Sequence, residues 1–306
     1  MHCRCRIPFR FAYFKNTFPS LAVILLVSSA CLAGEQVDRV EKRFSVNERP
    51  LIYIRNSDGR ITLRATQSPE VHVVAVKEAS RSMSADEAKR EADRVEVRIE
   101  QIGRRIEIEA KYPRMSGFWN HGPAILVHFD VSAPARSDVD AHSSDGPLLV
   151  DGFAGRLDLS SSDGKLTATG CSGQITSHVS DGETDIANVQ GELNAQSSDG
   201  PMNIEGTFTA LDLRSSDGKM DITVRPGSNM AREWSIRTSD GDIRLRLPDD
   251  FSADLDISTN DGRIRLEHAL TLSAGETSEH HISGKLNKGG LPLRVHASDG
   301  SISILK

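Results

Sequence analysis

The amino-acid sequence predicts an all-β protein, a parallel β-solenoid (β-helix) with coils of about 18 residues and a short N-terminal helix or cap. Three observations predict it. A Ser-Asp-Gly motif recurs at a constant interval, apolar and polar residues alternate on both sides of it, and the composition favours strands. Only 5% of the residues are aromatic, so a core of Val, Ile and Leu is expected.

The Ser-Asp-Gly motif has a period of 18 residues in the middle of the chain. Its aspartates there are Asp145, Asp163, Asp181, Asp199 and Asp217. An early copy holds Asp58, and later copies hold Asp240, Asp261 (after Asn260 instead of Ser) and Asp299. The later intervals of 23, 21 and 38 residues indicate inserted loops. We expect the nine aspartates to form a ladder of turns along one edge of a stack.

Residues two and four positions after each motif glycine are apolar in almost every copy. Ile61 and Leu63 follow the first motif, and Ile302 and Ile304 follow the last. The residue between them is mostly polar, which indicates a strand with one buried face. The same alternation precedes the motif, so each repeat is predicted to be a strand, a Ser-Asp-Gly corner and a second strand. A further corner carries Phe153, Cys171 and Val189 in successive repeats.

Two topologies are consistent with this repeat. Antiparallel hairpins with Asp-Gly turns would give the same alternation. In a solenoid, equivalent strands stack in parallel and every apolar column becomes one continuous internal stripe. The constant period favours the solenoid, because hairpins do not need equal spacing between alternate connections.

The repeated motif is interpreted as a structural corner. Glycine can adopt a positive φ without steric cost, aspartate can accept a hydrogen bond from a backbone amide two residues on, and serine can bond to the stacked neighbour. The alternative is a calcium-stiffened scaffold, because stacked carboxylates about 4.8 Å apart repel each other. The Gly-Gly-x-Gly-x-Asp pattern of calcium-binding repeats is missing. We therefore expect no cofactor, with calcium as the alternative.

Residues 1–33 have the layout of a secretory signal peptide. They carry basic residues and no acid, then the apolar run Leu21–Val27 and small residues. Cleavage after Ala33 is expected, and the competing site before Cys31 resembles a lipoprotein box that would leave Cys31 lipidated. The chain is then exported to the periplasm, the outer membrane or the cell surface, and a lipid on Cys31 would be its membrane attachment. The apolar run is short for the alternative, an uncleaved anchor.

Residues 36–135 are predicted to form an N-terminal cap and the first coils, and residues 136–306 the regular repeats. The segment through Ile61 is expected to open the stack. A capping box beginning at Ser84 predicts a short helix that lies outside the stack or covers its end. Between Tyr112 and Pro123, the residues Phe118, Trp119 and His121 are candidate ligand contacts, since exposed Trp can stack on sugars. The alternative is that Trp119 packs back on the cap.

The charge argues against nucleic acid as a partner. The formal net charge is −6, and because residues 1–33 hold four basic residues, the rest of the chain is at −10. Ligand spacings for zinc and the common nucleophile motifs are missing, so no metal site and no catalytic residue are predicted. The alternative is a β-helix enzyme acting on polysaccharide, with a groove on a face carrying Arg214, Arg237, Arg244 and Arg265.

Two segments carry a resemblance to a known family. The run from Leu157 to Leu166, Leu-x-Leu-x-Ser-Ser-Asp-Gly-Lys-Leu, is similar to the bacterial putative-adhesin family of β-strand repeat proteins. The segment from Gly284 to Ile302 resembles the usual end of that family. The resemblance implies an exported β-solenoid of unassigned function and no catalytic residues. The leading hypothesis is therefore an envelope-associated structural or interaction protein whose partner is an envelope protein or glycan.

Overall fold

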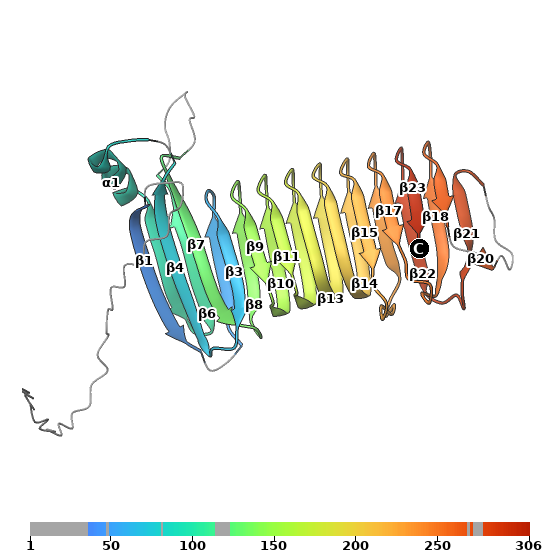
Figure 1. Cartoon of the computed structure of the whole chain (residues 1–306), viewed down its shortest axis with the longest axis horizontal. Coiled ribbons are helices and arrows are strands. Elements are labelled where there is room, and N and C mark those ends of the chain that lie inside the picture. The colour runs from blue at the N-terminus through green and yellow to red at the C-terminus, as the bar shows by residue number, and fades with distance from the viewer. Residues whose placement is uncertain (1–35, 47–48, 81, 114–122, 268–269, 272–277) are drawn as a thin grey trace, which may run out of the picture. The chain divides into compact units, whose positions relative to one another are not determined.

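A computed structural model describes residues 36–46, 49–80, 82–113, 123–267, 270–271 and 278–306. They belong to one compact unit, Gly34–Lys306. All strands of the described residues are linked into one 23-stranded sheet, which is folded into two facing layers joined by corners (Figure 1). The predicted all-β, solenoid-like fold is confirmed, and the sheet is mixed, with parallel strands in its centre and antiparallel strands at both ends.

We call the two layers face A and face B. In spatial order, face A contains β5 (Glu96–Ile102), β6 (Arg105–Lys111), β2 (Leu51–Asn56), β8 (Asp138–Ser143), β10 (Ala154–Ser161), β12 (Ser172–Val179), the second halves of β13 (Thr184–Ser197) and β14 (Met202–Ser215), β16 (Trp234–Thr238), β22 (Pro292–Ala297), β18 (Ala253–Thr259), β21 (His281–Leu286) and β20 (Leu270–Thr271). Face B contains β1 (Gln36–Ser45), β4 (Glu70–Ala79), β7 (Ile125–Pro134), β3 (Ile61–Thr66), β9 (Leu148–Asp151), β11 (Leu166–Thr169), the first halves of β13 and β14, β15 (Met220–Val224), β17 (Ile243–Arg246), β23 (Ile302–Leu305) and β19 (Ile264–Leu266).

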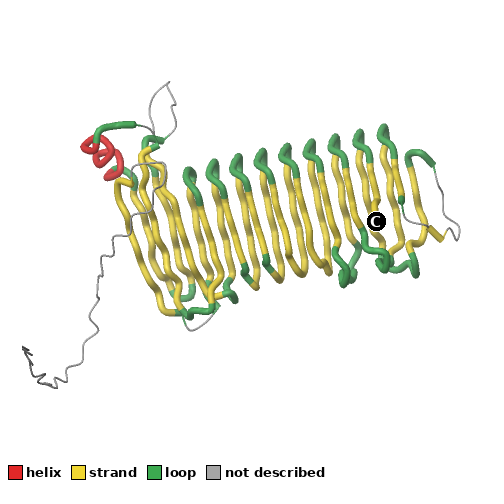
Figure 2. The backbone as a smooth tube through the Cα atoms, in the orientation of Figure 1, coloured by secondary structure: helices red, strands yellow, loops and turns green. Residues whose placement is uncertain are grey.

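Each central rung consists of one strand in face A, a Ser-Asp-Gly corner and one strand in face B. Equivalent positions of successive rungs pair in parallel, as Leu157 with Ile175 in face A and Leu166 with Thr184 in face B. The corners form a row along one long edge of the stack (Figure 2). Because these pairings are parallel, the alternative of antiparallel hairpins is wrong for the central rungs.

The rungs at both ends are stacked out of sequence order. The rung β2–β3 lies between β6–β7 and β8–β9, so the expectation that the segment through Ile61 opens the stack is wrong. At the other end, the C-terminal rung β22–β23 lies between β16–β17 and β18–β19. A rung fits between any two others because all rungs carry the same inward columns.

The N-terminal end of the stack is closed by antiparallel strands and the predicted helix. Strands β1 and β4 extend face B beyond β7, and β5 extends face A beyond β6. The helix α1 (Ala85–Asp93) begins at Ser84, whose hydroxyl accepts a hydrogen bond from the backbone of Glu87, as the capping box predicts. The helix contacts β1 and β7 and buries Ala88 and Ala92. At the opposite end, β21 pairs antiparallel with β18, and β20 with β21. Charged outward side chains on the edge strand β1 discourage pairing with another chain.

The core is one continuous cluster of buried side chains between the two faces. It consists mainly of Val, Ile and Leu, with Trp234 packed between Phe208 and Phe251. At the second corner Phe153, Cys171 and Val189 are buried, as the repeat predicts. Burial of each large apolar side chain stabilises the stack by about 1.5–3 kcal/mol.

Candidate functional site

The nine ladder aspartates line up along the Ser-Asp-Gly edge. All are exposed except Asp58, which is half-buried. Except at Asp58, the backbone amide of each aspartate donates to the carbonyl oxygen of the ladder serine one rung away, as from Asp163 to Ser144 at 2.9 Å and from Asp181 to Ser162 at 2.9 Å. The backbone hydrogen-bond ladder of the sheets therefore continues through the corners.

The aspartate side chains do not make the hydrogen bond that the sequence predicts. Within the described ranges, no ladder carboxylate accepts a hydrogen bond or joins an ion pair. The residue before the motif stabilises the corner instead. Ser143 donates to the carbonyl oxygen of Gly146 at 2.6 Å, and Ser161 to that of Gly164 at 2.8 Å. Ser, Thr or Asn immediately before the motif recurs in most repeats, and this recurrence is the sequence signal for the bond.

The motif glycines are required by close packing rather than by their φ angles. Of the nine, only Gly59 has a left-handed φ, at 96°, so the predicted role of positive φ is wrong for the others. A Cβ on Gly200 would lie well inside 3.0 Å of the carbonyl oxygen of Gly182, and the same overlap recurs along the column. Stacked corners approach so closely that only a residue without a side chain fits.

Tyr112 stands at the N-terminal end of this edge, on the corner between β6 and β7. Its hydroxyl donates to the carbonyl oxygen of Asp58 at 2.7 Å and accepts from the amide of Val127 at 3.1 Å. Burial raises the pKa of the phenol above its ordinary value. Tyr112 thus joins the rung β6–β7 to the first Ser-Asp-Gly corner.

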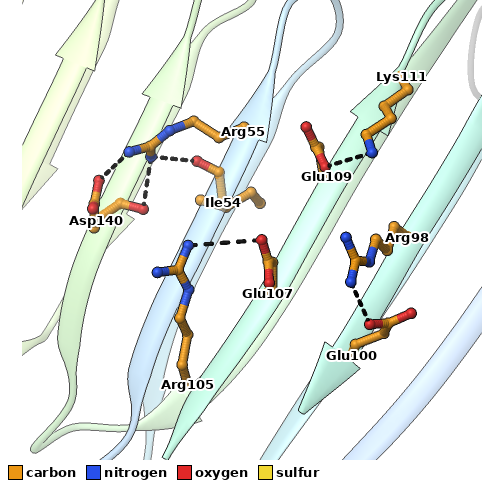
Figure 3. Close-up of polar contacts among 9 residues, drawn as sticks. All are labelled: Ile54, Arg55, Arg98, Glu100, Arg105, Glu107, Glu109, Lys111 and Asp140. Carbon is orange, nitrogen blue, oxygen red and sulfur yellow. Dashed lines mark hydrogen bonds and ion pairs between the residues drawn. The ribbon is translucent and has the colours of Figure 1, made fainter. Parts of the chain in front are cut away.

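On face A, the N-terminal end carries a network of charged side chains. The ring of Tyr53 is stacked between the guanidinium groups of Arg55 and Arg105, at 4.0 and 3.6 Å from the ring centroid. Arg55 also donates to Asp140 at 2.7 Å, and Arg105 faces Glu107 at 3.7 Å (Figure 3). Both faces of the Tyr53 ring are occupied by these arginines, so the ring is not free to stack on a sugar.

A depression of about 550 Å³ lies near this network, and its lining includes Arg49, Asp138 and Arg156. Asp138 accepts from the side chain of Arg49 at 2.5 Å, the side chain of Arg104 at 3.4 Å and the amide of Arg156 at 3.0 Å. Its carboxylate is therefore already satisfied by the protein.

On face B, charge is distributed differently along the stack. In the central rungs Lys165 is shared by two carboxylates, Glu183 at 3.0 Å and Asp185, and Asp185 also accepts from Asn203. Hydrogen bonds to Asp185 and Glu183 raise the pKa of Lys165.

Towards the C-terminal end of face B, cations outnumber the carboxylate that they share. Asp221 is shared by three cations, Lys219 at 3.1 Å, Arg246 at 3.0 Å and Arg244 at 3.8 Å. Burial acts to raise the pKa of Asp221, but the bonds from Lys219 and Arg246 outweigh it and hold the pKa below its ordinary value. This surface therefore has more cationic than anionic groups.

The four arginines of the enzyme hypothesis do not share a face. Arg214 and Arg237 are neighbours on β14 and β16 in face A, whereas Arg244 and Arg265 lie on β17 and β19 in face B. The expectation of one groove lined by all four is wrong, because each Ser-Asp-Gly corner separates its two flanking strands onto opposite faces. The candidate contacts Phe118, Trp119 and His121, and the candidate lipidation site Cys31, lie outside the described residues.

The Toastrack DUF4097 family model matches residues 51–305, which span the repeats and most of the cap. The chain belongs to this family. The resemblance to the bacterial putative-adhesin family, of unassigned function, is thereby confirmed. No curated protein matches this Toastrack chain.

Solved structures resemble the chain at low sequence identity. A "putative lipid binding protein" from Parabacteroides distasonis is 11% identical and has a TM-score of 0.50, with 88% of this chain and 97% of that chain covered. A "putative adhesin" from Parabacteroides merdae is also 11% identical, with a TM-score of 0.45 and coverage of 88% and 96%. The similarity to the first of these structures supports the fold of the Toastrack chain and leaves its ligand open.

Two features are absent from the described part of the Toastrack chain. It holds no group of three or more His, Cys, Asp or Glu side chains arranged to bind a metal ion. It also holds no helix that is both long and apolar enough to cross a bilayer. The description of the family and the names of the two structures above mention no catalytic activity.

Proposed function

We propose that this Toastrack chain is an exported, non-catalytic binding scaffold of the cell envelope. In this proposal its parallel rungs form a β-solenoid whose two polar faces are presented to an envelope protein or glycan. The observation that carries the proposal is the contrast between inward and outward positions. Inward and corner positions repeat from rung to rung, whereas one outward column of face B runs Thr167, Asp185, Asn203, Asp221, Arg244.

Such a surface suits binding better than catalysis. A catalytic site needs a unique set of acid, base or nucleophile groups converging in a pocket. Here the charged side chains lie on flat faces, and the pairs described above neutralise one another. The names of the matched structures, adhesin and lipid binding protein, support the same class of function.

The predicted leader, residues 1–33, supports export. Expression of the full chain in a bacterium, followed by fractionation and mass spectrometry of its N-terminus, tests this part. We expect an envelope protein that begins at Gly34 or at a lipidated Cys31. An intact Met1 in the cytoplasmic fraction would contradict the proposal.

Binding is tested separately by sedimentation of the purified exported chain with isolated envelope fragments. We expect saturable co-sedimentation without release of sugar or peptide fragments. Turnover of envelope polysaccharide would show that the chain is an enzyme and would reject the scaffold role.

A further inference from the structure

Face B carries an excess of positive charge at its C-terminal end, although the chain as a whole is acidic. Five cations lie on β15, β17 and β19 or directly before them, against two carboxylates, Asp221 and Asp242: the cations are Lys219, Arg244, Arg246, Arg263 and Arg265. Three of them share the single carboxylate of Asp221. Arg265 pairs with Glu267 at 3.0 Å, and Arg263 joins no ion pair within the described residues.

The C-terminal rung places a serine in the middle of this cationic surface. Ser303 on β23 is in register with Arg244 on one side and with Arg265 on the other. Neighbouring strands are about 4.8 Å apart, so each arginine side chain can reach a group that lies over Ser303. The two arginine side chains are 48% and 73% exposed, and Ser303 is half-buried with no side-chain hydrogen bond in the described part of the chain.

We propose that Arg244, Ser303 and Arg265 bind a carboxylate group of an acidic polysaccharide that lies along the stack across β17, β23 and β19. Guanidinium groups bind carboxylates in a bidentate geometry, and a serine hydroxyl between them supplies a further donor. Lys219, Arg246 and Arg263 extend the cationic surface on both sides of this trio. The proposal deepens the scaffold role and rests on it, because it names the class of ligand.

The observations favour a polysaccharide over a lipid surface. The cations follow the stack direction on a flat sheet, which matches an extended polymer with repeated carboxylates. The large apolar side chains that are exposed among the described residues, Ile102 and Leu291, lie on β5 and in the loop before β22, away from this surface. A bilayer surface would therefore find no apolar side chain to insert here.

The test measures binding of the purified exported chain to polygalacturonate, with dextran as the neutral polymer. R244Q/R265Q should weaken binding to polygalacturonate at least tenfold. The matched control R214Q/R237Q removes the same charge from face A and should leave binding within twofold. S303D, which places a carboxylate between the two arginines, should also weaken binding at least tenfold while the melting temperature stays that of the wild type.

Four outcomes would overturn the proposal: no binding of the wild type to polygalacturonate, equal losses in both double variants, unchanged binding of S303D, or binding only to phosphatidylglycerol vesicles. Loss of folding in R244Q/R265Q leaves S303D as the deciding variant. Wild-type chain that binds envelope fragments but not polygalacturonate would refute this inference and keep the scaffold role. Wild-type chain that binds neither would refute both.

Discussion

The central rungs, residues 136–224, and the C-terminal end, residues 225–306, share the same inward columns and corners but differ in order and charge. The central segment contains 15 acidic and five basic residues, and its rungs follow one another in sequence order. The C-terminal segment contains 12 acidic and 11 basic residues, and its last rung is inserted between two earlier ones. The two regions show that corner and core residues specify the repeat, while outward residues and rung order give each region its own surface.

The largest expected effect tests the rung order directly. Ser303→Cys with Arg244→Cys should form a disulfide on oxidation, because in-register neighbours on adjacent strands lie within disulfide range. The closed loop should stabilise the chain by about 4 kcal/mol. Non-reducing electrophoresis and thermal unfolding measure both effects. Arg244→Cys with Arg265→Cys, two rungs apart, should not cross-link, and the reverse result would indicate stacking in sequence order.

The glycine column should respond differently in the two regions. Gly200 lies between two central rungs that cannot move apart, so we expect Gly200→Ala to lower the free energy of unfolding by about 3 kcal/mol. Gly262→Ala meets the same overlap with Gly300, but it lies in the outermost Ser-Asp-Gly corner, which can shift outward. For Gly262→Ala we expect the free energy of unfolding to fall by about 1 kcal/mol. Urea denaturation checks both values, and equal losses would show that the end is packed as rigidly as the centre.

The different ratios of cations to carboxylates around Lys165 and around Asp221 predict a smaller difference in stability between the two regions. Lys165→Gln leaves Glu183 and Asp185 unneutralised side by side and should cost about 0.5–1 kcal/mol at low salt. Lys219→Gln leaves Asp221 paired with Arg246 and Arg244, so its cost should be close to zero. Urea denaturation at low and high salt measures the pair. A loss for Lys219→Gln as large as that for Lys165→Gln would contradict the cationic excess at the C-terminal end.

The lowered pKa of Asp221 predicts a change in the acid range. A carboxyl whose folded pKa lies below its unfolded value of about 3.8 contributes stability above that value and loses it as pH falls through the folded pKa. Asp221→Asn should therefore reduce the loss of stability between pH 5 and pH 3 by about 0.5 kcal/mol, because the Asp221 side chain is 26% exposed and solvent screens part of its interaction with the cations. Urea denaturation at both pH values measures it. An unchanged pH dependence would mean that the cations stabilise Asp221 no more in the folded chain than in the unfolded one.

Calcium should have the smallest effect. The ladder aspartates form a single column, and calcium prefers six to eight oxygen ligands, so we expect the melting temperature with calcium or with chelator to agree within about 1 °C. A clear rise with calcium would show that the aspartate ladder binds the ion and would favour the stiffened scaffold. Asp181→Asn with Asp199→Asn is the matching control, since it should abolish any such rise.

Much of the repeat follows from local sequence. Alternation such as Ile302-Ser303-Ile304 determines which side of a strand is buried, and the motif glycines mark the corners. The role of each corner residue was harder to predict from sequence, because a glycine needed for close approach and a glycine needed for its φ angle look identical there. Ser161, whose hydroxyl stabilises the corner, lies one position before the motif. The repeat period alone does not distinguish a serine at that position from any other polar residue of the strand.

The sequence by itself therefore determined the all-β repeat, its 18-residue period, its buried columns and the capping helix that begins at Ser84. Only the tertiary structure decided the order of the rungs and the composition of each face. Every rung offers nearly the same inward surface, so stacking energy does not distinguish one neighbour from another. Loop connections and the antiparallel strands at each end make that choice, and they bring Ser303 between Arg244 and Arg265.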